Sequence, residues 1–497
     1  MVIYHNYRKW IGLFLIASTL LLIVIDMTVL YTVLPIITRE LHLTASKKLW
    51  IINAYPLVVA GLLPITGMLS DRIGHKKMLM SGFPIFTLAS IFAAFSPNSA
   101  CLIASRILLA AGASIMMPAT LSIVRYIFTE PKERSLAIGI WAAVASGGAA
   151  IGPLLGGILL EYFWWGSVFL INVPIITLLL PLSLFIIPNC GGNKKRYMDI
   201  FGSIFILISL ISLIYALKQF SNPKFYFLDF SISIIIGILF MILFISQQNK
   251  QNQPIIDFSL FKNNFFSAGI ITALITMSIV VSIELLLSQR LQLVIKLSPL
   301  QTALCIIPIP IASMIASPLI GLLLPKLQEK KIIIIGFLLK IIGITNVIIF
   351  YEFSLSYLII NLFIFGIGVG IIFTTASNTI MTHAPDEKSG MASSIEDIAY
   401  ELGSVLGITI LGGLMTLFYR HILFIPTQII IDKKIFDSID QALNIALTMH
   451  KNYAEIIILA ANTAFNKSLI LVFIAMIIIL IISIFIIKHM LSNSNKN

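Results

Sequence analysis

The chain has 497 residues, of which 59% are hydrophobic and 11% are charged, less than half the charged share that is usual in soluble domains. This composition excludes an ordinary soluble protein and, since a membrane-spanning helix needs roughly 20 apolar residues, predicts an all-α polytopic membrane protein. The net charge is +12, but the Lys and Arg residues lie in short breaks between apolar runs, a pattern that sets membrane topology rather than one that binds nucleic acid. The three cysteines form no Cys-x-x-Cys pair, so no metal site is predicted.

Apolar runs interrupted by charged or turn residues predict fourteen membrane spans in three groups. The first group contains six spans, near residues 11–36, 48–69, 78–95, 100–124, 135–160 and 166–187. Two isolated spans follow, near 200–217 and 227–246. The last group contains six spans, near 265–287, 300–324, 331–350, 355–381, 390–416 and 468–487. The predicted domains are an N-terminal six-helix bundle (1–190), an inserted helix pair with its linkers (191–264) and a C-terminal six-helix bundle (265–497).

The distribution of basic residues predicts the orientation of these spans. When the N-terminus is placed inside, most Lys and Arg residues of the short loops and tails fall on that same side. The positive-inside rule therefore puts both termini in the cytoplasm and the long loop 417–467 outside.

An internal repeat relates the two groups of six spans. The segment Gly67–Lys77 aligns without gaps on Gly321–Lys331, and both segments join the second and third spans of their group. Glycines align in nearly the same register: Gly112 with Gly366, Gly148 with Gly403, and Gly152 with Gly407. Parallel repeats of this kind resemble the architecture of the major facilitator transporters, in which a central site lies between the halves.

One signature of that family, Gly-x-Leu-(Ala/Ser)-Asp-Arg-x-Gly-Arg-Lys-(Lys/Arg), is closely matched by the loop after the second span. The loop reads Gly67-Met-Leu-Ser-Asp71-Arg72-Ile-Gly74-His75-Lys76-Lys77. Its glycines allow a tight turn at the membrane face, and its aspartate can meet a helix N-terminus or an arginine. The resemblance implies a cytoplasmic latch formed by Gly67, Asp71, Arg72, Gly74 and Lys76. A basic loop that only sets topology is the alternative.

A second signature, the antiporter pattern Gly-x-x-x-Gly-Pro-x-x-Gly-Gly, is matched in full by the fifth span. The segment reads Gly148-Ala-Ala-Ile-Gly152-Pro153-Leu-Leu-Gly156-Gly157. Its first three spaced glycines fall on one helical face and permit close helix contact, while the proline favours a kink. The resemblance implies a hinge of the kind found in exporters. A generic helix-packing face is the alternative.

The first span carries a third pattern. Its segment Leu22–Pro35 resembles the Leu-Asp-x-Thr-Val-x-Asn-x-Ala-Leu-Pro pattern of fourteen-helix drug:proton antiporters. The similarity continues through Phe169–Pro174 and Gln292–Pro299 to Tyr400–Gly403 and covers nearly the whole chain. It implies an exporter similar to the antiseptic-resistance and methyl-viologen-resistance proteins, which handle lipophilic cations. Asn53 stands where some of these carry an acidic residue on the second span.

Asp26, in the first span, is the first candidate for proton coupling. A carboxylate within a membrane span is rare, because its insertion costs about 2.5–3.5 kcal/mol. Arg106, in the fourth span, matches the family's buried arginine, and a cation that approaches Asp26 would promote release of its proton. We therefore expect the pair to couple proton movement to conformation, with a static ion pair as the alternative.

Three more carboxylates, Glu396, Asp397 and Glu401, lie within two helical turns of the thirteenth span, with the last two on one face. Clustered acids repel one another when ionised, so at least one is expected to hold a proton until a cation arrives. A solvated helix end is the alternative, since the run begins near a predicted cytoplasmic turn. Glu284, late in the ninth span, is a further candidate for the site and alternatively lies at the outer surface.

These patterns predict a proton-coupled secondary exporter of lipophilic organic cations in the cytoplasmic (inner) membrane of a bacterium. No Walker A loop or hydrolase motif occurs, so the proton gradient is the expected energy source, with no cofactor and no metal. The expected partners are a cationic small molecule, protons and the lipid bilayer, with no nucleic acid and a monomeric chain. The alternatives are an exporter of an endogenous metabolite such as an amino acid or polyamine, or a polytopic membrane enzyme or channel.

Overall fold

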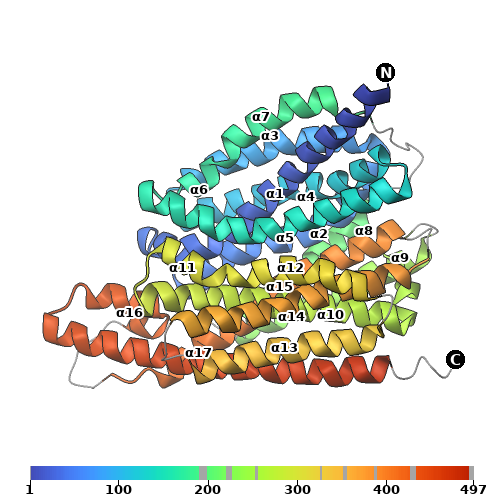
Figure 1. Cartoon of the computed structure of the whole chain (residues 1–497). Coiled ribbons are helices and arrows are strands. Elements are labelled where there is room, and N and C mark those ends of the chain that lie inside the picture. Colours follow the sequence, from blue (N-terminus) through green and yellow to red (C-terminus); the bar gives the residue numbers. More distant parts are fainter. Residues whose placement is uncertain are drawn as a thin grey trace.

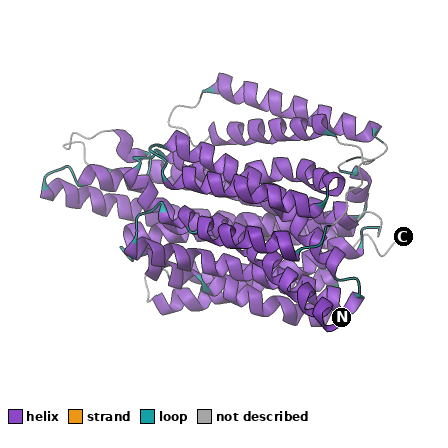
Figure 2. Cartoon of the chain, turned by 90° about the horizontal axis from the view of Figure 1, so that it is seen from above, coloured by secondary structure: helices purple, strands orange, loops and turns teal. Residues whose placement is uncertain are grey.

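The computed structural model describes residues 2–189, 199–219, 226–251, 254, 256–324, 327–350, 355–385, 389–425 and 433–491. Every secondary-structure element in these ranges is helical, and the long helices run roughly side by side (Figure 2). The first group contains α1 (Val2–Glu40), α2 (Ala45–Ile73), α3 (His75–Ala94), α4 (Ser99–Ile127), α5 (Pro131–Tyr162), α6 (Ser167–Leu170) and α7 (Asn172–Ile186). The predicted linker residues 190–198 lie outside the described ranges.

The remaining helices follow the predicted order. The inserted pair contains α8 (Ile200–Gln219) and α9 (Phe227–Lys250). The last group contains η1 (Phe258–Lys262), α10 (Asn264–Gln289), the π-helix η2 (Arg290–Val294), α11 (Pro299–Ile306), α12 (Pro308–Leu323), α13 (Glu329–Ile349), α14 (Leu355–Thr382), α15 (Ser389–Ile422), η5 (Lys433–Phe436), α16 (Ile439–Ala446) and α17 (Lys451–Met490).

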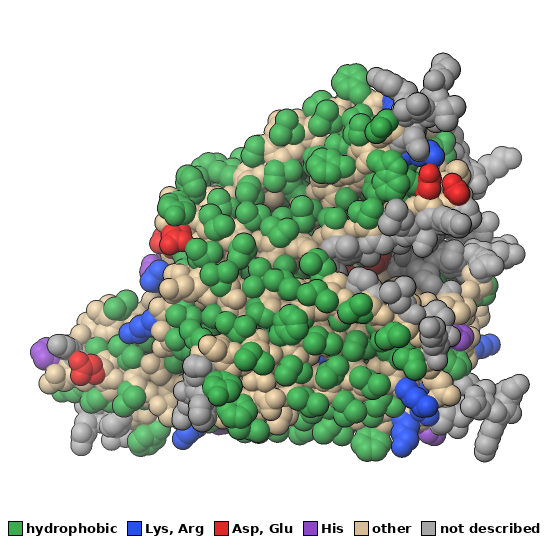
Figure 3. All heavy atoms as spheres, viewed as in Figure 1, with side chains coloured by type: hydrophobic (Ala, Val, Ile, Leu, Met, Phe, Trp, Pro, Cys, Tyr) green, Lys and Arg blue, Asp and Glu red, His purple; other side chains and the backbone are tan. Residues whose placement is uncertain are grey.

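The described helices have the lengths and composition that a bilayer requires. Eleven helical segments are long and apolar enough to cross a membrane, and two shorter apolar helices, Gly147–Tyr162 and Phe201–Leu217, accompany them. Apolar side chains cover most of the face in Figure 3, while charged side chains gather near the two ends of the bundle. A helix forms hydrogen bonds between its own backbone N–H and C=O groups, and hydrocarbon offers these groups no other partner. The chain is therefore a multi-pass helical membrane protein.

The two groups of helices use the same internal pairing. In the first group α1 packs against α5, and in the last group α10 packs against α15. The inserted helices α8 and α9 pack on each other, and α8 also contacts α2 and α15. We call the first group, α1 to α7, the N-half and the group from α10 to α17 the C-half; the domain boundaries themselves stay a prediction.

The segment predicted as the loop 417–467 differs from a simple connection. Helix α15 continues to Ile422 and α17 already begins at Lys451, so helix fills much of this segment. Hydropathy predicts the part of a helix that lies in hydrocarbon. Helix α17 extends beyond that part because its first turns pack against α16. Helix α16 and the first turns of α17 project at one end of the bundle, away from the first turn of α1 and the last turn of α17 (Figure 1). We call the projecting end the distal end.

Candidate functional site

A buried ion pair lies in the N-half. Arg106 of α4 donates from Nη1 to Oδ2 of Asp26 of α1 over 2.8 Å, and both side chains are buried. Asn172 of α7 donates from Nδ2 to the other oxygen of Asp26 at 3.0 Å and to Ser90 of α3 at 3.1 Å. Side chains of α1, α4 and α7 thus meet at this carboxylate, α3 supports Asn172, and each oxygen of Asp26 has a hydrogen-bond donor.

The guanidinium of Arg106 has a second neighbour, the aromatic ring of Tyr55 on α2. Its Cζ atom lies 4.5 Å from the ring centroid, a cation–π geometry. Neither Nε of Arg106 nor the hydroxyl of Tyr55 has a hydrogen-bond partner among the described residues. Sequence reasoning found Asp26 and Arg106 but missed Tyr55 and Asn172. Asn172 lies in a segment that carries the family resemblance, which was the available signal.

The carboxylates of α15 have fewer partners. Glu396 accepts hydrogen bonds from Ser377 of α14 at 3.3 Å and from the hydroxyl of Tyr400 at 3.1 Å. Glu401 is 7% exposed, and its Oε2 has no hydrogen-bond partner within the described part of the chain. Asp397 is half-buried. The structure places these acids inside the bundle, so the alternative of a solvated helix end is wrong for Glu396 and Glu401.

Glu284 of α10 is also buried, with 9% of its surface exposed. The alternative that placed it at the outer surface is therefore wrong. Tyr31 of α1 lies within electrostatic reach of Glu284 and Glu401, and Tyr55 lies within reach of Asp26 and Glu401. The carboxylates of the two halves therefore border one region between α1, α2, α10 and α15.

Three glycines of the antiporter signature, on α5, pack against α1. A Cβ added at Gly152 would lie 2.0 Å from Oγ1 of Thr28, and one at Gly156 would lie 2.7 Å from Val29. Gly148 lies against Val24 in the same way. These positions bracket Asp26, so the close contact of α5 with α1 occurs at the level of the ion pair. Pro153 lies inside α5.

Gly157, the last residue of the signature, faces the other half. A Cβ at this position would lie 2.6 Å from Cα of Leu300 in α11. The repeat-related glycines of α15 behave like those of α5. Gly403 packs against the backbone of α10 at Leu274, and Gly407 packs against it at Ser278. Sequence alignment of the repeats had paired these glycines, and the structure gives them equivalent neighbours.

The loop signature joins α2 to α3. Gly74 has a φ of 107°, which favours glycine, and its N–H donates to the carbonyl of Ser70. Lys76 donates from Nζ to the carbonyl of Leu184 at the end of α7 over 2.8 Å, which stabilises the negative end of that helix. Arg72 is exposed and Gly67 has open space around it, while the side chain of Asp71 lies outside those described.

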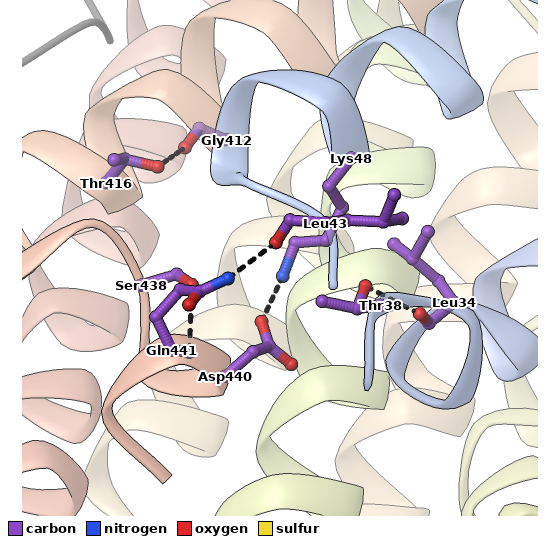
Figure 4. Close-up of polar contacts among 9 residues, drawn as sticks. All are labelled: Leu34, Thr38, Leu43, Lys48, Gly412, Thr416, Ser438, Asp440 and Gln441. Carbon is purple, nitrogen blue, oxygen red and sulfur yellow. Dashed lines mark hydrogen bonds and ion pairs between the residues drawn. The ribbon is translucent and has the colours of Figure 1, made fainter. Parts of the chain in front are cut away.

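Several polar contacts join the halves toward the distal end. Lys48 of α2 forms a buried ion pair with Asp440 of α16, and Gln441 donates to the carbonyl of Leu43 at 2.8 Å (Figure 4). Asn53 of α2 donates to Thr409 of α15 at 2.8 Å. A cavity of about 40 Å³ beside Lys48 is large enough for a few water molecules but too small for an organic cation. The bundle is therefore closed at this end.

These features define a helical membrane transporter with a polar centre between two repeated halves. The family model described as Major Facilitator Superfamily matches residues 16–408, and the chain belongs to that superfamily. It is therefore a transporter and not an enzyme. No group of His, Cys, Asp or Glu that could hold a metal ion occurs among the described residues.

Curated relatives narrow the class. The methyl viologen resistance protein SmvA of Salmonella typhimurium is 35% identical over 468 residues, which are 92% of this chain and 93% of that protein. The multidrug efflux pump LfrA of Mycolicibacterium smegmatis is 34% identical over 420 residues, 84% and 83% of the two chains. A crystal structure of a bacterial homologue of the human lysosomal transporter Spinster shares the fold, with a TM-score of 0.67, 14% identity and 97% of each chain covered.

Proposed function

We propose that the protein is a proton-coupled antiporter that exports lipophilic organic cations. One observation carries the proposal: Glu401 is buried, within electrostatic reach of Tyr31 and Tyr55 of the N-half, and has an oxygen that no described group binds. A buried, ionised carboxylate without a partner is costly, so this group favours a state in which it holds either a proton or a cation. The efflux functions of SmvA and LfrA support a drug as the substrate.

The proposed exchange takes place at the carboxylates of the C-half. A substrate cation that reaches Glu401, with Glu396, Asp397 and Glu284 nearby, displaces a proton from the group that holds it. The tyrosine rings near these acids suit a cation with an aromatic or apolar body. No cofactor takes part, and the proton gradient supplies the energy.

Asp26 and Arg106 have a different proposed role. Because the two charges neutralise each other, Asp26 binds a proton or a cation only when the ion pair changes. We propose that this change accompanies the movement of α1 against α5, where the glycines of the antiporter signature allow close contact and Pro153 provides the hinge. The loop signature acts as the latch on the side of the termini.

We propose fourteen membrane spans, a monomer, and a bacterial inner membrane with both termini in the cytoplasm. In a background without native cysteines, a membrane-impermeant maleimide should label Leu447→Cys in intact cells, because this residue of the distal end is 79% exposed. Tyr7→Cys, 70% exposed near the N-terminus, should be labelled only after the membrane is opened. The reverse pattern would overturn the orientation.

Ethidium transport in inverted vesicles tests the function itself. We expect uphill uptake when the vesicle interior is acidified, and loss of uptake when an ionophore collapses the proton gradient. Glu401→Gln should remove uphill transport, while Glu455→Gln, which changes an exposed glutamate of α17, should not. Uptake that persists without a gradient would contradict antiport.

The same vesicles address the remaining alternative. An exporter of an endogenous amino acid or polyamine would be driven by the same gradient but would not transport ethidium. Proton release on addition of spermidine or an amino acid, with none on addition of ethidium, would replace the drug proposal with that one.

A further inference from the structure

Pro35 creates a specific hydrogen-bonding demand in α1. It lies inside the helix, and proline has no N–H to donate to the carbonyl four residues earlier. That carbonyl belongs to Tyr31. A backbone carbonyl without a hydrogen-bond donor is unfavourable in the hydrocarbon core of a membrane, so the Tyr31 carbonyl needs a donor from elsewhere.

The donor comes from the other half of the protein. Ser288, near the end of α10, donates from Oγ to the carbonyl of Tyr31 at 3.0 Å. Gln292, in the π-helix η2, donates from Nε2 to the carbonyl of Thr32 at 2.9 Å and to Oγ of Ser288 at 3.1 Å. Ser288 is 1% exposed. The carbonyl that α1 cannot satisfy is therefore satisfied across the interface between the halves.

We propose that Ser288 and Gln292 are positioning residues that hold the distal end closed. Ser288 binds the Tyr31 carbonyl that Pro35 frees, and Gln292 binds the neighbouring carbonyl of Thr32 and supports Ser288. We call this set of contacts the α1–α10 clasp. Alternating access in this fold moves one half against the other around a central site, and when the distal ends separate, water replaces Ser288 at the Tyr31 carbonyl. The carbonyl then has a donor in both states, which keeps the two states close in energy.

The clasp is also connected to the proposed binding region. Glu284 lies four residues before Ser288 on α10, and therefore on the same helical face. The side chain of Tyr31 lies within electrostatic reach of Glu284 and Glu401. A ligand or proton at these acids thus acts next to the residue whose carbonyl the clasp holds. The inference needs only the transporter fold and would survive failure of the cation or proton proposals.

A double-mutant cycle between Pro35 and Ser288 tests the inference. The reporter is Leu285→Cys, a buried residue beside the distal cavity, in a background without native cysteines. Ser288→Ala should speed labelling by an impermeant maleimide about fivefold, the effect of losing one ordinary hydrogen bond, and should alter the transport rate. In a Pro35→Ala background the new N–H satisfies Tyr31, so Ser288→Ala should then change labelling by less than about twofold.

Two further variants complete the test. Ser282→Ala removes a hydroxyl that donates to the carbonyl of Ser278 in its own helix and has no other bond within the part of the chain that the structure describes, so it should leave labelling unchanged. Ser288→Thr keeps the donor and should restore the native labelling rate, which decides the question even where Pro35→Ala fails to insert. Equal acceleration by Ser288→Ala in both proline backgrounds, or equal rates for Ser288→Ala and Ser288→Thr, would overturn the clasp.

Discussion

The carboxylates of the two halves differ in how their charge is balanced. In the N-half, Asp26 has Arg106 at 2.8 Å and an amide at 3.0 Å. Among the described residues of the C-half, Glu396 has only neutral hydroxyl donors, and Glu401 has a buried oxygen with no partner. The repeat therefore keeps the helix packing of the halves but not their electrostatics.

This difference separates two tasks that one carboxylate could not perform alone. An acid that is already neutralised by arginine attracts a substrate cation weakly, whereas an acid without a cation attracts it strongly. Breaking a buried pair is costly, so the pair in the N-half suits a conformational step, and the acids of the C-half suit binding. The following variants test this division.

Asp26→Asn should have the largest effect. It leaves Arg106 buried without a counter-charge, which costs about 3–5 kcal/mol, and it should abolish uphill efflux of ethidium. Thermal unfolding in detergent and transport in vesicles measure the two effects. In Asp26→Asn/Arg106→Gln both charges are absent, so the melting temperature should recover while uphill efflux stays absent. Recovery of efflux as well would make the pair a static structural element.

The equivalent glycines should respond differently to alanine. At Gly407 a Cβ would lie 2.3 Å from the backbone oxygen of Ser278, whereas at Gly152 it would meet the hydroxyl of Thr28, which can rotate. Because overpacking costs about 1–3 kcal/mol, we expect Gly407→Ala near the upper end of that range and Gly152→Ala near the lower. Melting temperatures measure which variant loses more stability. Gly147→Ala is the control, because nothing lies within 4 Å of the Cβ that it adds. A larger loss at Gly152 would show that α1 and α5 are the more rigid pair.

Glu401→Gln should have the smallest effect on stability and a selective effect on binding. Loss of one unpaired charge should weaken ethidium binding about tenfold and weaken the dication methyl viologen more, because a Coulomb energy scales with the ligand charge. Fluorescence titration of the purified protein measures the first affinity, and competition measures the second. Identical affinities in Glu401→Gln and the native protein would remove Glu401 from the binding site.

Much of this architecture could be predicted from the sequence because its causes are local. Hydropathy marks a span without knowledge of its neighbours, so the order of the helices agrees with the prediction, and charged residues such as Asp26 and Arg106 stand out in apolar runs. Helix ends outside the membrane were less predictable. Helix α17 begins 17 residues before the predicted span, at Lys451 instead of residue 468, because α16 packs against it.

The sequence by itself determined the class of the protein, since composition, basic loops and glycine spacing act through the bilayer and the local backbone. Only the tertiary structure decided which polar and charged groups from distant parts of the sequence meet. Asn172 reaches Asp26 from 146 residues away, Lys48 reaches Asp440 from 392, and Ser288 reaches the carbonyl of Tyr31 from 257. No local pattern encodes such pairs, because each depends on how packing positions distant helices. A freed carbonyl or a buried carboxylate can accept a hydrogen bond from any suitable donor that the packing brings within reach.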